Sequence, residues 1–122
     1  MPLSRNMLNF LGYALERPGE LAGFVERDMA VGLGYPFGIK SMLKQGLIVE
    51  GDYQIPLPKE GERLLPGCPY GEISEGYRLT PLGAQVGYVG MRARAAGGGY
   101  NGPHWEAYVA EGQEVIDAAP YV

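Results

Sequence analysis

Apolar side chains recur at helical spacing in four stretches of the chain. This periodicity predicts four helices, over residues 4–16, 20–31, 36–46 and 81–95. Ser4 is a suitable N-cap for the first helix, and Gly46 suits the position just after the third. Thr80 can cap the fourth, with Pro81 in the first helical position, where its missing N–H costs nothing.

Apolar and polar positions alternate instead between the third and fourth predicted helices. Residues 47–57 and 73–80 follow this alternation, so that Tyr77 and Leu79 fall on one face of an extended segment. Pairing the two segments gives an antiparallel β-hairpin. Residues 56–72, between them, are rich in proline and glycine, which predicts a long irregular loop at its tip. A loop of this length favours a functional or ligand-contacting role.

Length and composition indicate one packed domain. The chain has 122 residues, of which 46% are hydrophobic and 20% charged, which supports a modest core and argues against global disorder. No apolar run approaches the roughly 20 residues that a membrane span needs. The N-terminal residues lack the basic and apolar regions of a signal peptide. We therefore expect a cytoplasmic protein without membrane contact.

Few residues offer catalytic or metal-binding chemistry. Cys68 is the single cysteine and His104 the single histidine, so one chain can form neither an internal disulfide nor a common Cys/His zinc site. The sequence contains no dinucleotide-binding glycine motif, no phosphate-binding loop and no nucleophile elbow. The expectation is a protein that is not an enzyme and that uses neither cofactor nor metal.

The formal net charge of −4 lies entirely at the end of the chain. Residues 1–96 carry ten basic and ten acidic side chains, whereas residues 97–122 carry four acidic ones and no Lys or Arg. Three consecutive glycines at 97–99 predict a flexible joint. We therefore expect a domain over 1–96 and an acidic, aromatic tail over 97–122. Within this tail, 103–118 is a candidate helix that docks on the body or on a partner.

The segments Leu43-Lys44-Gln45-Gly46-Leu47-Ile48-Val49 and Tyr77-Arg78-Leu79-Thr80-Pro81-Leu82-Gly83 together resemble the second half of a winged helix-turn-helix domain. The pattern is similar to that of small transcriptional regulators of the PadR and MarR kind. The resemblance covers about residues 4–95. It implies an α+β fold with three N-terminal helices, a β-hairpin wing and a further helix. It also implies binding to double-stranded DNA, with helix 36–46 in the major groove, and a homodimer.

The resemblance assigns candidate DNA contacts to this chain. Residues of the recognition helix and the turn before it would face the groove, those of the wing tip would reach the backbone, and one wing-strand arginine would contact phosphate: Tyr35, Lys40, Ser41, Lys44, Lys59, Arg63 and Arg78. A structural role without DNA contact is also possible for these residues. The two helix lysines equally fit a solvated face, the tyrosine a core position, and Arg78 an ordinary strand surface.

A second function stays open. Many winged helices bind proteins, and the acidic, aromatic tail suits a basic protein surface. Trp105, Tyr108 and Glu111 are the candidate partner contacts. Small phage or mobile-element inhibitors of nucleic-acid-handling complexes, of the anti-CRISPR type, have a similar size and charge. A third interpretation has the tail fold back over the basic helix and compete with DNA.

Overall fold

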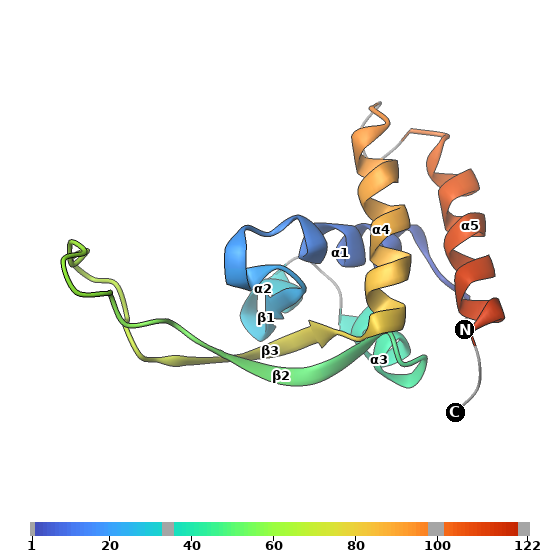
Figure 1. The fold of residues 1–122 in the computed structure, drawn as a ribbon. Coiled ribbons are helices and arrows are strands. Elements are labelled where there is room, and N and C mark those ends of the chain that lie inside the picture. Colours follow the sequence, from blue (N-terminus) through green and yellow to red (C-terminus); the bar gives the residue numbers. More distant parts are fainter. Residues whose placement is uncertain (1, 33–35, 98–101, 120–122) are drawn as a thin grey trace.

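The computed structural model describes residues 2–32, 36–97 and 102–119. It contains helices and one three-stranded antiparallel sheet, so the predicted α+β class is confirmed (Figure 1). In chain order the elements are α1 (Arg5–Glu16), the 3₁₀ turn η1 (Gly19–Leu21), β1 (Phe24–Glu26), α2 (Arg27–Gly32), α3 (Pro36–Lys44), β2 (Ile48–Gln54), β3 (Ile73–Leu79), α4 (Pro81–Ala95) and α5 (Trp105–Ala118).

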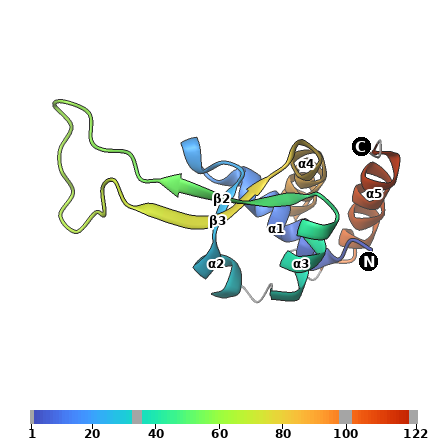
Figure 2. The ribbon, with the colours of Figure 1, turned by 90° about the horizontal axis from the view of Figure 1, so that it is seen from below.

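The sheet has the strand order β1-β3-β2. β2 and β3 form the predicted hairpin, paired along their whole length from Ile48 opposite Leu79 to Gln54 opposite Ile73. β1 pairs with only part of β3, from Phe24 opposite Arg78 to Glu26 opposite Gly76. The hairpin extends well away from the helices and ends in the loop that joins its strands (Figures 1 and 2).

The second predicted helix is wrong in its first half. Residues 20–31 were expected to be one helix, but a 3₁₀ turn and β1 occupy Gly19–Glu26 and only Arg27–Gly32 is α-helical. Gly23 has φ +83°, which an α-helix cannot accommodate. Phe24 and Val25, on opposite faces of the strand, are both buried. A short strand that buries both faces has the same close apolar spacing as a helix, so periodicity does not distinguish them.

α1 and α4 cross at very close range because glycine faces the contact on both helices. A Cβ atom at Gly90 would lie 2.4 Å from the carbonyl oxygen of Leu8, and one at Gly12 would lie 2.7 Å from the carbonyl carbon of Gly90. The helix boundaries of α4 agree with the prediction, and Thr80 caps it by accepting a hydrogen bond from Gly83 N–H. The glycines of α4 thus permit the close approach of α1.

α5 belongs to the same core as the other helices. Trp105 is 2% exposed within the hydrophobic cluster that α1 and α4 share. Gly112 lies against Leu3 and Leu8, and Gln113 Oε1 accepts a hydrogen bond from Leu3 N–H at 2.7 Å. The candidate helix within 103–118 therefore exists and docks on the body. No helix in the described ranges has the length and apolarity that crossing a membrane requires.

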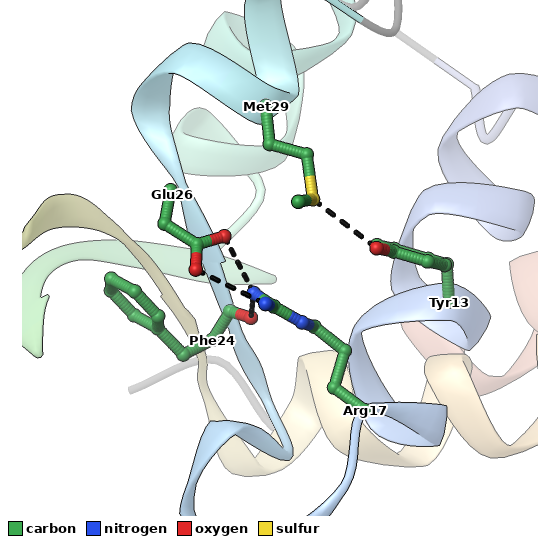
Figure 3. A network of polar contacts seen from close by, with 5 residues as sticks. All are labelled: Tyr13, Arg17, Phe24, Glu26 and Met29. Carbon is green, nitrogen blue, oxygen red and sulfur yellow. Dashed lines mark hydrogen bonds and ion pairs between the residues drawn. The ribbon is translucent and has the colours of Figure 1, made fainter. Parts of the chain in front are cut away.

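A polar network fastens β1 and α2 to the end of α1 (Figure 3). Arg17, which follows α1, donates to the carbonyl oxygen of Phe24 at 3.0 Å and forms an ion pair with Glu26. Tyr13 donates its hydroxyl proton to the sulfur of Met29 at 3.2 Å. These contacts hold the three-residue strand in place beside β3.

Candidate nucleic-acid interface

The outer face of α3 presents two lysines. Ile39 and Met42 turn inward and are buried, so Lys40 and Lys44, one turn apart, are exposed on the solvent side. Their position agrees with the sequence-based prediction. Tyr35, the candidate from the turn before this helix, lies outside the described residues.

Ser41 differs from its predicted role as a groove-facing residue. Its exposure is 7%, and its Oγ accepts a hydrogen bond from Gln45 Nε2 at 2.7 Å. Ser41 is buried although the neighbouring positions Lys40 and Lys44 on α3 are exposed. The hydroxyl is therefore occupied within the chain and does not face solvent.

The hairpin loop is built from hydrogen-bonded turns. Backbone N–H groups of Glu62, Cys68 and Glu72 donate to carbonyl oxygens three residues earlier, at 2.9, 3.2 and 3.1 Å. The third residues of these turns are Gly61, Gly67 and Gly71, which have φ between +78° and +86°. Successive turns of this kind give the tip a defined backbone path beyond the last cross-strand hydrogen bonds, between Ile55 and residues 71 and 72.

Lys59 and Arg63 are exposed at this tip, as predicted. They share it with two exposed carboxylates, Glu60 and Glu62. Three leucines are also exposed there, Leu57 at 71%, Leu64 at 65% and Leu65 at 61%. The sequence analysis did not identify these leucines. They could have been predicted to be exposed, because they lie inside a proline- and glycine-rich loop that is too irregular to pack against a core.

Arg78 is engaged within the sheet. Its Nη2 donates to the backbone oxygen of Asp52 at 2.9 Å, and its guanidinium lies 5.1 Å from the centre of the Phe24 ring. Gly51 provides the room, because a Cβ atom there would lie 3.1 Å from Arg78 Cγ. The predicted phosphate contact is thus a side chain that covers Phe24 and holds an edge carbonyl of β2.

The ion pairs divide the chain's ten basic residues into two groups. Four arginines form salt bridges with carboxylates: Arg17 with Glu26, Arg27 with Glu75, Arg92 with Glu111 and Arg94 with Glu16. Arg78 binds a carbonyl, and Arg5 also has an interaction. In the part of the chain that the structure describes, the side chains of Lys40, Lys44, Lys59 and Arg63 take part in no ion pair or hydrogen bond.

The three candidate partner contacts of the C-terminal segment turn toward the protein itself. Trp105 is buried in the core. Tyr108 is half-buried, with Arg92 5.5 Å from the centre of its ring, and Glu111 forms an ion pair with the same arginine. Burial removes Trp105 as a partner contact, whereas Tyr108 and Glu111 keep part of their surface exposed. The acidic side chains that α5 does expose are Glu106, Glu114 and Asp117.

Potential metal ligands do not cluster in the described residues. Across those ranges, no three His, Cys, Asp or Glu side chains come together as a metal site would require. Cys68 is a free, half-buried thiol in the hairpin loop, and His104 Nε2 lies 3.0 Å from the carbonyl oxygen of Ala93.

Comparison of the chain with protein-family models, with curated proteins and with solved structures gave no match.

Proposed function

We propose that this chain is a winged-helix protein that binds double-stranded DNA, with α3 in the major groove and the hairpin tip on the adjacent backbone. The supporting observation is the distribution of basic side chains. The four without an intramolecular partner in the described residues lie in two places, Lys40 and Lys44 on α3 and Lys59 and Arg63 at the hairpin tip. A recognition helix and a wing tip need free cations at these two places.

The order of elements supports the winged-helix part of the proposal. A helix, a short strand, two helices and a hairpin follow one another, and the short strand pairs with the second hairpin strand. In a winged helix this arrangement leaves the third helix accessible beside the wing. Here the chain runs from α3 into β2, and α3 lies at the end of the hairpin opposite its loop (Figure 2).

The position of the acidic helix is compatible with DNA binding. α5 lies at the end of the molecule away from the hairpin loop, so the chain's excess negative charge is remote from the wing tip (Figure 1). Because α5 docks on α1 and α4, this arrangement does not favour the third interpretation, in which the acidic tail folds over the basic helix and competes with DNA. The proposal includes a homodimer, because a second copy doubles the small number of available cations.

The decisive experiment is a salt titration of binding to random duplex DNA. We expect the affinity of the full chain to fall steeply as salt rises, and Lys40→Glu with Lys44→Glu to abolish binding while the circular dichroism spectrum is unchanged. Glu106→Gln with Glu114→Gln on α5 is a useful comparison, since it alters charge far from the hairpin without removing a cation. Unchanged affinity in the lysine variant would refute the proposal.

A second candidate function is protein interaction through the hairpin tip. It is supported by Leu57, Leu64 and Leu65, each more than 60% exposed on a loop whose turns are hydrogen-bonded. Residues 49–79 also carry six carboxylates against three basic side chains, which suits a basic protein better than phosphate. If this function is correct, Leu64→Ser with Leu65→Ser should abolish binding to the protein partner and leave DNA affinity unchanged. A pull-down with an identified partner measures the first effect.

A further inference from the structure

A groove lies at the root of the hairpin, where β2 begins and β3 ends. Its volume is about 620 Å³, and its walls come from the turn after α3, the first turns of α4 and the end of α5. Leu82 and Val115 are among the described residues that line it, and none of these is Asp, Glu, Lys or Arg. We refer to it as the root groove. Its lining favours an apolar occupant, because a charged one would lose water without gaining a partner.

The exposed leucines of the hairpin lie at its opposite end. Leu57, Leu64 and Leu65 are between 61% and 71% exposed, in the loop beyond the paired strands. The strands are paired from Ile48–Leu79 to Gln54–Ile73, and seven extended residues span about 20 Å. The hairpin tip of one chain therefore cannot fill the root groove of the same chain (Figure 1).

A second copy of the chain can supply the tip. When two hairpins run side by side in opposite directions, each tip lies at the root of the other, whatever the length of the hairpin. The root groove and the leucines lie at the two ends of one hairpin, so a single contact of this kind implies an identical second contact by two-fold symmetry.

The charges near the two ends are complementary. The tip carries Lys59 and Arg63, whose side chains form no ion pair within the described part of the chain. Exposed Glu114 lies on α5 one turn before Ala118, which lines the root groove. Exposed Lys44, at the end of α3, precedes the groove directly and can face the two carboxylates of the tip. Both signs of charge at the tip therefore have an opposite charge at the root.

The paired part of the hairpin restricts the contact to its ends. Glu50 and Asp52 are exposed on β2, which is the outer strand of the sheet. Two copies that joined through their β2 edges would bring these carboxylates together, which disfavours one continuous sheet across the dimer.

We propose that this chain forms a two-fold dimer in which Leu64 and Leu65 of each hairpin tip occupy the root groove of the other copy. The tip cations of one copy then lie at the same end of the dimer as α3 of the other copy. Two chains thereby bring together the cations that the proposed DNA contact uses. The dimer itself forms without DNA, so it goes beyond the proposed function and is tested independently of it.

The test is sedimentation equilibrium of the full chain in the absence of DNA. We expect a dimer, and we expect the tip variant Leu64→Ser with Leu65→Ser to raise its dissociation constant about tenfold or more. The groove variant Gln85→Lys with Ala118→Lys should have a similar effect, because it places two cations in an uncharged groove. All four positions are exposed, so each variant should fold, and thermal unfolding checks this.

Mixing the two variants separates tip exchange from other modes of association. The tip variant keeps an intact groove and the groove variant keeps an intact tip, so a mixed dimer regains one of the two contacts. We expect the equimolar mixture to associate about fivefold more tightly, or better, than either variant alone.

The matched control is Val49→Ser with Ile73→Ser, which removes two exposed apolar side chains from the paired part of the hairpin and should leave the dissociation constant unaltered. Four results would overturn the proposal. They are a monomer at millimolar concentration, a tip variant that associates like the wild type, an equal effect of the control, or a mixture that associates no better than its components.

Discussion

Two hydrogen bonds join Arg17 to Glu26, Nη1 to Oε2 at 2.6 Å and Nη2 to Oε1 at 3.1 Å (Figure 3). The same Nη1 donates to Phe24 O. One arginine at the end of α1 thus fixes both ends of β1, whose three residues would otherwise be held mainly by their pairing with β3.

The Arg17–Glu26 pair makes stability depend on pH. Burial raises the pKa of Glu26, but the hydrogen bond from Arg17, a backbone hydrogen bond and the arginine charge outweigh it, so the pKa lies below its ordinary value of 4.5. A carboxyl group with a lowered folded-state pKa contributes stability above its unfolded pKa and loses it as pH falls through the folded value. Stability from this pair is therefore complete at neutral pH and declines below about pH 4.5.

We predict that Glu26→Gln lowers the free energy of unfolding by about 1 to 3 kcal/mol at pH 7, since a hydrogen-bonded, partly buried charge pair is lost. Urea unfolding at several pH values should show the gap between wild type and variant closing as pH falls toward 3. Glu75→Gln, in the exposed pair with Arg27, is the control and should cost at most about 1 kcal/mol. A gap that is constant between pH 7 and 3 would contradict the assignment.

Docking of α5 gives a second prediction, about Trp105. This side chain is 2% exposed in the shared core, so Trp105→Ala should destabilise the protein by about 3 to 5 kcal/mol. Tyr88→Ala on α4, where the aromatic ring is 61% exposed, should cost far less. Chemical denaturation of both variants measures the difference. Similar small losses would mean that α5 does not contribute to the core.

Local sequence signals predicted the elements that have their own caps and periodicity. The bounds of α4 follow from Thr80 and Pro81, and the hairpin follows from alternation. β1 could not be predicted in this way, because a three-residue strand exists only through its pairing with Arg78, Tyr77 and Gly76. The acidic charge and the glycines at 97–99 led to the prediction that residues 97–122 form a tail. Whether this segment packs on the domain depends instead on contacts of Trp105 and Gly112 with core residues that are distant in sequence.

Glycine at the α1–α4 contact supports a third prediction. A Cβ atom at Gly90 would lie 2.4 Å from Leu8 O, which is backbone and cannot move away cheaply, so Gly90→Ala should destabilise by about 1 to 3 kcal/mol. Gly38→Ala on α3 is the matched control. There the nearest atom is Met7 Cγ at 3.5 Å, so helix propensity should dominate and stabilise by up to about 1 kcal/mol. Thermal unfolding should therefore shift in opposite directions, and shifts of the same sign would refute the packing argument.

The exposure of a candidate site residue could be predicted from the sequence only where helix periodicity determines it. Lys40 and Lys44 are exposed because Ile39 and Met42 turn inward, which periodicity already indicates. The partners of Arg78 are set by tertiary structure, because Asp52 and Phe24, which contact its guanidinium, are distant in sequence. Ser41 has a local partner, Gln45 four residues later, and its burial was not apparent from the pattern. A polar side chain in a promising position is available to a ligand only when no neighbour has bound it first.

This availability leads to the last prediction, on the salt dependence of DNA binding. Each cation that contacts phosphate contributes about 0.9 to the slope of log affinity against log salt, so Lys40→Gln with Lys44→Gln should reduce its magnitude by about 2. Lys59→Gln with Arg63→Gln should do the same. Arg92→Gln with Arg94→Gln removes equal charge, but Arg92 is already paired with Glu111 on α5 and Arg94 with Glu16 on α1, so the slope should not change. If the three variants reduce the slope equally, net charge alone drives binding, and neither α3 nor the hairpin tip is a specific contact.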